Sequence, residues 1–388
     1  MRYNFDTPVD RRGTASIKWD YSKHFTGLEE LLPLWVADMD FPSCKEVTEA
    51  LKRRAEHGIF GYTLEPESYF QAVIDWMRHR HQWKIHRGWM VAAPGVVPSL
   101  NLSIMSYSQP GDGVIIQPPV YYPFKESILN NERRVVENPL RLEGNRYTMD
   151  LDQLEEAIDE RTRLLVLCSP HNPVARVWNR QELEQLVQIC RQRRIIILSD
   201  EIHHDLILEG HHHTPAASLS EEAAAITVTL TSATKTFNLA GLSCSLVITS
   251  DKDLRERYRD TQKRVCSGIA NAFSTAAAEA GYRHGEGWLQ QVLEYIQGNY
   301  RFLVAFLGQR LPGARVIPLE GTYLAWIDFR ALGLSDEQLK ERILKKARVW
   351  LDDGPMFGTG GEGFQRINLA CPRSTLEQAL EAMVRVLG

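Results

Sequence analysis

Seven short apolar runs, most of them continuous rather than alternating, limit most strongly how this chain of 388 residues can fold. Strands that are buried on both faces of a parallel sheet have such continuous runs. The runs cover residues 90–92, 114–117, 134–136, 164–168, 194–198, 226–230 and 245–249. Amphipathic stretches lie between them. This alternation predicts an α/β fold, with a mainly parallel, doubly wound sheet flanked by helices.

Two polar residues predict where helices of this region begin. Asp150 is followed three residues later by Gln153, and Asn179 by Glu182. A small polar residue followed at that distance by Gln or Glu is the capping pattern of a helix N-terminus. A helix over 180–191 would carry its apolar residues on one face, namely Leu183, Leu186, Val187 and Cys190.

The pattern changes after about residue 287. A long helical stretch over 288–310 precedes extended pieces at 315–317 and 322–328, and a further helix is predicted over 335–347. This order predicts a smaller α+β domain at 288–388 beside a large α/β domain at 46–287. We expect residues 1–45 to pack with the smaller domain.

Charge and hydropathy argue against several classes of partner. The formal net charge is −4, which gives no reason to expect nucleic acid or an anionic membrane surface as a partner. Apolar runs stay far below the roughly 18 residues that a membrane span needs. The first residues contain no apolar signal core, and the six cysteines are scattered without metal-like pairing. We therefore expect a cytoplasmic protein with reduced thiols.

A histidine tract at 211–213, preceded by His203 and His204, raises the question of a metal site. The tract lies in a loop with Gly, Thr and Pro, and its spacing is not that of ligands on one helix face. A surface loop is the favoured interpretation and a metal site the alternative. No metal is expected.

A lysine and an aspartate stand where two predicted strands end. Lys235 follows the apolar run 225–230 and has small hydroxyl residues beside it, and Asp200 follows the run 195–198. In open α/β sheets, ligands bind outside the carboxyl ends of the strands. A lysine that forms a Schiff base and an aspartate that holds a pyridinium nitrogen are the groups that pyridoxal phosphate needs.

Other strand ends carry groups that suit the same cofactor. The segment 94–99 opens a helix, whose N–H groups could bind a phosphate. Tyr121 offers a ring for stacking, although ordinary packing would also explain it. Asn172 could donate to a phenolate oxygen, although an Asn before Pro is commonly only a turn residue. Each signal is weak alone, and their order along the chain is what favours one cofactor.

The chain resembles fold-type-I pyridoxal-phosphate enzymes over nearly its whole length, and more narrowly the MalY/PatB group of carbon–sulfur β-lyases of the cystathionine β-lyase type. Six segments carry the resemblance: 34–41 (LWVADMDF), 60–63 (FGYT), 169–173 (SPHNP), 199–203 (SDEIH), 235–242 (KTFNLAGL) and 365–373 (QRINLACPR).

The resemblance implies a role for each candidate site residue. Lys235 would be the Schiff-base lysine and catalytic base, and Asp200 the partner of the pyridine nitrogen. The other residues implied in cofactor binding are Tyr121 against the ring, Asn172 and His203 near the phenolic oxygen, Val96, Val97 and Ser232 at the phosphate, and Tyr62 from the neighbouring subunit. Arg366 would bind the substrate α-carboxylate, with Tyr122 nearby.

The resemblance further implies a homodimer with shared active sites and a sulfur-containing amino acid as substrate. The reaction would be α,β-elimination to a thiol, pyruvate and ammonia. An aminotransferase of class I/II is the alternative, and a regulatory role through protein contacts could accompany either activity.

Two positions depart from the expected pattern. Ala175 stands where many relatives have Gly, which could alter the turn. Ser243 stands where fold-type-I aminotransferases often have an Arg for the phosphate, and this favours the lyase.

Overall fold

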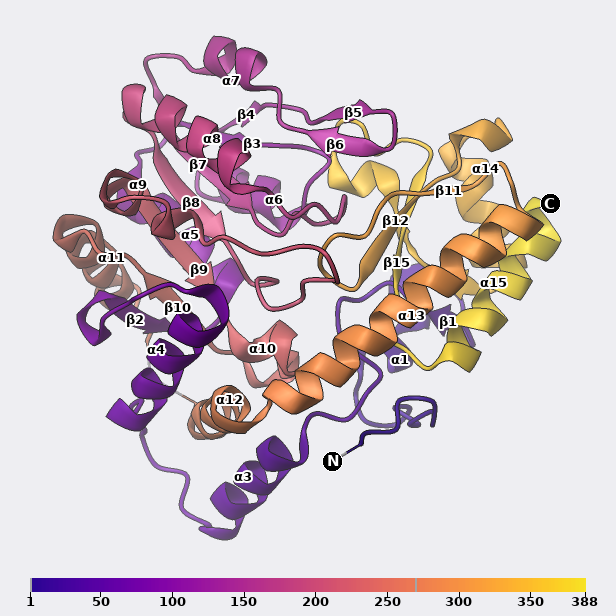
Figure 1. Ribbon diagram of the computed structural model, residues 1–388, viewed down its shortest axis with the longest axis horizontal. Coiled ribbons are helices and arrows are strands. Elements are labelled where there is room, and N and C mark those ends of the chain that lie inside the picture. The colour runs from indigo at the N-terminus through magenta and orange to yellow at the C-terminus, as the bar shows by residue number, and fades with distance from the viewer. Residues whose placement is uncertain (1, 269–270) are drawn as a thin grey trace.

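A seven-stranded sheet forms the centre of the computed structural model, which describes residues 2–268 and 271–388 (Figure 1). Its strand order is β2-β10-β9-β8-β7-β3-β4. β10 pairs antiparallel with both of its neighbours, β2 and β9, and the other pairs of neighbouring strands are parallel, so the predicted mainly parallel sheet is confirmed. The strands are β2 (Met90–Ala93), β3 (Gly113–Ile116), β4 (Arg134–Glu137), β7 (Thr162–Cys168), β8 (Ile196–Asp200), β9 (Thr227–Thr231) and β10 (Ser245–Ile248).

The continuous apolar runs reflect burial on both faces of this sheet. In β7, Leu164 and Val166 pack in the same core cluster as Leu100, whereas Leu165 and Leu167 pack in the cluster that contains Leu183. Because successive side chains of a strand point to opposite faces, most residues of a covered strand are apolar, although β9 also buries Thr227, Thr229 and Thr231.

Helices cover both faces and connect the strands. They are α3 (Lys45–Glu56), α4 (Glu67–His81), α5 (Val96–Tyr107), α6 (Pro123–Asn130), α7 (Leu151–Ala157), α8 (Arg180–Gln192), α9 (Glu221–Ile226), α10 (Ala233–Thr236), α11 (Lys252–Arg264) and α12 (Ala272–His284). Asn179 and Glu182 form the complete predicted capping box of α8. Asp150 caps α7 by accepting from the Gln153 N–H at 3.1 Å. A small hairpin, β5 (Arg141–Glu143) and β6 (Arg146–Thr148), lies before α7.

A second, antiparallel sheet lies in the C-terminal part, in the order β11-β12-β15-β14. Its strands are β11 (Arg315–Val316), β12 (Leu324–Asp328), β14 (Asp352–Asp353) and β15 (Phe364–Asn368), and its helices are α13 (Glu286–Arg310), α14 (Asp336–Lys340) and α15 (Arg373–Leu387). Figure 1 shows α13 running from α12 to the C-terminal elements. The helix predicted over 335–347 begins at α14, whose N-cap is Ser335, and continues beyond α14 as a π-helical turn, Glu341–Lys346.

The N-terminal segment packs along the second sheet. It contains α1 (Ile17–Asp20), α2 (Ser22–Thr26) and β1 (Leu32–Pro33), and β1 pairs in parallel with β13 (Val349–Trp350). The boundaries at 45 and 287 stay a prediction. Within the described residues, none of the helices combines the length and apolar character that crossing a membrane requires.

Candidate active site

A cavity of about 260 Å³ lies at the ends of the central strands. Of the residues predicted from the sequence, those that line it are Val96, Val97, Tyr121, Asn172, Asp200, His203 and Lys235. They come from five separate connections of the sheet. The fold therefore brings together most of the residues predicted to hold the cofactor.

Lys235 sits on the short helix α10, which the Ser232 side chain caps. Its Nζ donates to the carbonyl oxygen of Ala37 at 2.6 Å. Burial lowers the pKa of Lys235 to about 8, because a desolvated ammonium is disfavoured, while the Asp38 carboxylate opposes the shift. The amine can therefore lose its proton near neutral pH.

Asp200 is the last residue of β8, and its side chain is buried. One carboxylate oxygen accepts from the Ile202 N–H at 3.1 Å. Burial raises the pKa of Asp200 to about 7, although that hydrogen bond works in the opposite direction. A cationic ring nitrogen beside this carboxylate would stabilise its charged form.

Three further features fit pyridoxal phosphate. The first N–H groups of α5, at Val96 and Val97, face no preceding helical turn, and such groups bind phosphates. His203 is buried, and its Nδ1 has no hydrogen-bond partner within the described ranges, as expected for a group that meets a ligand oxygen. Burial lowers the pKa of His203 far below its usual value, so the ring is neutral.

Two predicted cofactor residues do not line the cavity. The Ser232 hydroxyl accepts from the Thr234 N–H at 3.1 Å and donates to the Cys244 carbonyl at 2.5 Å. Tyr62 lies in the loop between α3 and α4 and is 96% exposed. Its predicted role concerns a neighbouring subunit. Both roles stay predictions.

Arg366 connects the cavity to the second sheet. Its Nη1 donates to Oδ1 of Asn172 at 2.8 Å, and its guanidinium lies 5.0 Å from the centre of the Phe357 ring. Asp352 and the carbonyl of Trp35 accept from its Nη2. A cation is thus held close to the cavity wall. Tyr122 lies at the start of α6 with its ring 5.4 Å from that of Tyr121.

The sequence analysis did not identify Ala37, Tyr323 or Asp352 as site residues. The Tyr323 hydroxyl donates to the same Ala37 carbonyl at 2.8 Å, and Asp352 pairs with Arg366. The segment 34–41 served only as a mark of resemblance. A backbone carbonyl acceptor cannot be recognised from residue types, because every residue has one. No motif in the residues that precede the strand 364–368 indicated a role for Asp352.

The two departures from the family pattern both have left-handed backbone conformations. Ala175 has a φ of 59° and Ser243 a φ of 48°. Glycine adopts this conformation more readily than a residue with a side chain, which agrees with the glycine that the resemblance led us to expect at position 175. Ser243 lines the cavity, so this point of the cavity wall has a serine rather than an arginine.

The predicted surface position of the histidine tract is only partly right. His211 and His212 are exposed, but His213 is buried with its Nε2 3.0 Å from Oε2 of Glu201. Buried glutamates need such a partner. His213 therefore anchors its loop to Glu201, the residue after Asp200.

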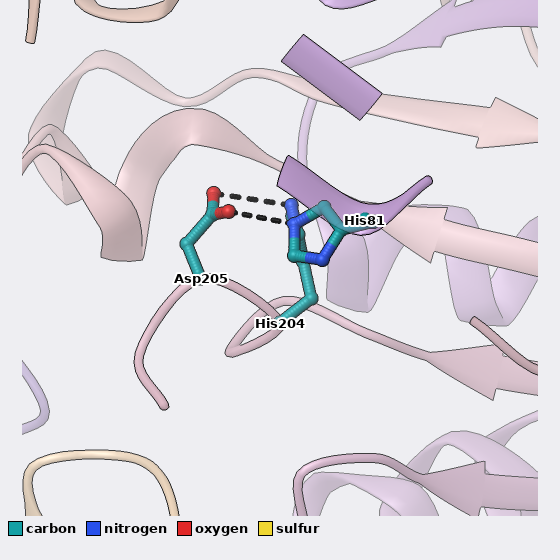
Figure 2. A group of neighbouring side chains, drawn as sticks. All are labelled: His81, His204 and Asp205. Carbon is teal, nitrogen blue, oxygen red and sulfur yellow. Dashed lines mark hydrogen bonds and ion pairs between the residues drawn. The ribbon is translucent and has the colours of Figure 1, made fainter. Parts of the chain in front are cut away.

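A buried group with metal-like composition, His81, His204 and Asp205, lies nearby (Figure 2). His204 Nε2 is 3.1 Å from Oδ2 of Asp205, and its Nδ1 is 2.5 Å from the carbonyl of Glu201. The Thr231 hydroxyl also lies 3.0 Å from Nδ1. The Asp205 carboxylate raises the pKa of His204 against the effect of burial. Contacts within the protein thus hold the His204 ring beside the Asp205 carboxylate.

Comparison with known proteins gives concordant matches. Residues 29–383 match the family aminotransferase class I and II. The chain is 42% identical over 386 residues to cystathionine beta-lyase PatB of Bacillus subtilis (strain 168), covering 99% of this chain and 100% of that protein. Cystalysin of Treponema denticola, which contains a pyridoxal 5'-phosphate cofactor, superimposes with a TM-score of 0.96 at 39% identity, covering 100% and 99% of the two chains. A PLP-bound protein of Clostridium difficile 630 that carries an aminotransferase name superimposes with a TM-score of 0.98 at 43% identity, with both chains fully covered.

Proposed function

The chain belongs to the aminotransferase class I and II family, and we propose that it is a pyridoxal-phosphate-dependent carbon–sulfur β-lyase. Its substrate would be cystathionine or another S-substituted cysteine. The observation that carries the proposal is the convergence of the Lys235 amine and the Asp200 carboxylate on one buried cavity. The names of the PatB and cystalysin relatives favour elimination over amino transfer, as does Ser243 in place of an arginine.

Lys235 would hold the cofactor covalently, and Asp200 would pair with its ring nitrogen. The remaining cofactor contacts are Tyr121, Asn172 and His203 at the ring, and Val96, Val97, Ser232 and the Tyr62 of a second subunit at the phosphate. When bound, pyridoxal phosphate withdraws electrons from the Cα of an amino acid, so that a proton and then a β-substituent can leave.

Lys235 is the group that would move the Cα proton. A general base has to be neutral, and the pKa of about 8 brings a neutral amine within reach at physiological pH. The Ala37 carbonyl fixes where this amine points. Arg366 would hold the α-carboxylate of the substrate, next to Tyr122, and so set which substrate atoms face Lys235.

The reaction would consume cystathionine and water and would need no other reactant. The carbon–sulfur bond of cystathionine breaks and the sulfur leaves as the thiol of homocysteine. Water then converts the remaining three-carbon enamine to pyruvate and ammonia.

We also propose a cytoplasmic homodimer. The loop between α3 and α4 exposes apolar side chains that a single chain does not cover, namely Ile59, Phe60, Tyr62 and Leu64. A groove of about 890 Å³ between α3 and α12 lies beside them. All six cysteines are free thiols in the described part of the chain, as expected in a reducing compartment.

Purified protein loaded with pyridoxal phosphate tests the function directly. With cystathionine it should release homocysteine, pyruvate and ammonia in equal amounts. An absence of pyruvate would refute the lyase. Transfer of the amine to an added 2-oxo acid, without thiol release, would identify an aminotransferase instead.

A further inference from the structure

The guanidinium of Arg366 is already engaged by acceptors of the protein itself. Nη1 donates to Asn172 at 2.8 Å, and Nη2 donates to the carbonyl of Trp35 at 3.0 Å. The same Nη2 also donates to Oδ2 of Asp352, which the pairing of β14 with β15 places directly opposite Arg366. Nε is buried and has no hydrogen-bond partner among the residues that the structure describes.

This arrangement limits how a substrate carboxylate can bind. A carboxylate binds arginine most strongly through two parallel N–H···O bonds. The planar fork offers two edges for this, Nε with Nη2 and Nη1 with Nη2. Both edges include Nη2, whose two hydrogens point to Trp35 and Asp352. A second carboxylate therefore gains a full edge only if one of these acceptors leaves.

Asp352 is the acceptor that can leave. The Trp35 carbonyl belongs to a fixed backbone, because the neighbouring Leu34 N–H donates to the carbonyl of Trp350 at 2.8 Å. The Asp352 carboxyl, in contrast, is at the end of a side chain and borders a separate cavity of about 370 Å³ into which it can turn.

We propose that Asp352 is an internal competitor for the substrate α-carboxylate on Arg366, and that it leaves the arginine and takes up a proton when an amino acid binds. The inference rests on the proposed role of Arg366 in the lyase. A buried carboxylate that loses its cation becomes protonated rather than remaining charged. Asp352 thus weakens substrate binding, while it keeps the free arginine paired and oriented.

The surroundings of Asp352 favour the neutral form. Burial raises the pKa of Asp352 to about 6 even with Arg366 in contact, and the adjacent Asp353 carboxylate acts in the same direction. The other charged or titratable groups around it are Lys340, which pairs with Asp353 at 2.8 Å, Lys345 on the wall of the same cavity, and the phenols of Tyr121 and Tyr122.

The variant Asp352→Asn tests the proposal, because it keeps the shape and removes the charge. The probe is 3-(methylthio)propanoate, which carries the carboxylate and the thioether but no amine and so does not react. Calorimetry on the cofactor-loaded protein should show a Kd lower by about tenfold in Asp352→Asn than in the wild type, the scale of one charged hydrogen bond. The uncharged 3-(methylthio)propanamide should bind both proteins equally, and Asp260→Asn, at an exposed position of α11, should behave as the wild type. An unchanged or higher Kd for the propanoate in Asp352→Asn would overturn the proposal.

A measurement on the wild-type protein decides the matter if the variant does not fold. Calorimetry near pH 7.5 in two buffers of different ionisation enthalpy should show that about one proton is taken up for each propanoate bound. The reason is that the pKa of Asp352 must rise once the propanoate carboxylate pairs with Arg366 in its place. Binding without proton uptake would overturn the proposal. Release of pyruvate from cystathionine is scored separately, so a failed lyase assay and a failed competitor test remain distinct.

Discussion

The Nζ amine of Lys235 donates a hydrogen bond to the backbone carbonyl of Ala37 at 2.6 Å, although the two residues are 198 positions apart in the chain. The segment 36–41 presents this carbonyl, and two asparagines hold the segment. Asn368 donates to the carbonyls on either side of Ala37 at 2.6 Å each, and Asn238 donates to two further carbonyls at 2.9 Å each. The direction of the Lys235 amine therefore depends on two distant parts of the chain, the segment 36–41 and Asn368, and on the nearby Asn238.

Tyr323 shares the Ala37 carbonyl with Lys235 through a hydroxyl that donates at 2.8 Å. In Tyr323→Phe the oxygen has one donor fewer, so its bond to the charged lysine strengthens. We expect the pKa of Lys235 to rise from about 8 by roughly half a unit to one unit. The rate of amine-specific labelling of Lys235 in cofactor-free protein, followed against pH by peptide mass spectrometry, measures the change.

Tyr107→Phe is the matched control, since Tyr107 donates to the carbonyl of Leu254 at 2.9 Å, outside the residues that line the cavity. It should leave the labelling profile of Lys235 unchanged. A pKa that falls or stays constant in Tyr323→Phe would mean that the shared oxygen does not tune the lysine.

The central sheet could be predicted because most of its strands are buried on both faces and are therefore mainly continuous apolar runs. The strand β15 could not, because it carries the buried polar residues Gln365, Arg366 and Asn368 in place of an apolar run. Polar residues are stable there only because other elements provide their hydrogen-bond partners. Those partners, such as the carbonyls of segment 36–41, are known only once the fold is known.

The same reason separates the predicted from the missed site residues. Lys235 and Asp200 each follow a recognisable strand, so their common position at one edge of the sheet follows from the topology. Asp352 faces Arg366 only through the register of an antiparallel pair. Register between short strands depends on tertiary packing, which the local sequence does not encode.

The buried carboxylate of Asp205 accepts hydrogen bonds from Trp76 at 3.0 Å, from Thr236 next to Lys235 at 2.8 Å, and from His81 at 2.7 Å. In Asp205→Asn the charge that these donors and His204 stabilise is lost, and we expect the free energy of unfolding to fall by about 3 kcal/mol. Urea unfolding of the cofactor-loaded protein measures it. Asp75→Asn, which removes an exposed ion pair with Arg78, should change it by less than about 1 kcal/mol. Equal effects of both substitutions would show that the Asp205 charge is not a stabilising centre.

His171 should make stability depend on pH in a defined direction. Burial lowers its pKa to about 4, against about 6.5 in an unfolded chain. Between these values the unfolded chain binds a proton that the folded protein does not. The contribution of His171 is therefore complete above pH 6.5 and is lost as the pH falls toward 4, with a total of as much as ~3 kcal/mol.

The variant His171→Gln isolates this contribution. The difference in unfolding free energy between wild type and His171→Gln should shrink as the pH is lowered from 7 to 4. The exposed His212→Gln should show a constant difference. A difference between wild type and His171→Gln that grows toward acid pH would contradict the lowered pKa.

Tyr62 provides the test of shared active sites, since it is 96% exposed in the single chain. If it completes the site of a neighbouring subunit, Lys235→Ala in one subunit and Tyr62→Ala in the other damage the same site of a mixed dimer. One site of that dimer carries both substitutions, and the other carries neither.

Each variant alone should have low activity, with a loss of at least ~10²-fold for Lys235→Ala. After the two are unfolded together and refolded at equal amounts, about a quarter of wild-type activity should return, because half of randomly paired dimers are mixed and each has one intact site. If Tyr62 acted within its own chain, every subunit would remain damaged and mixing would restore nothing.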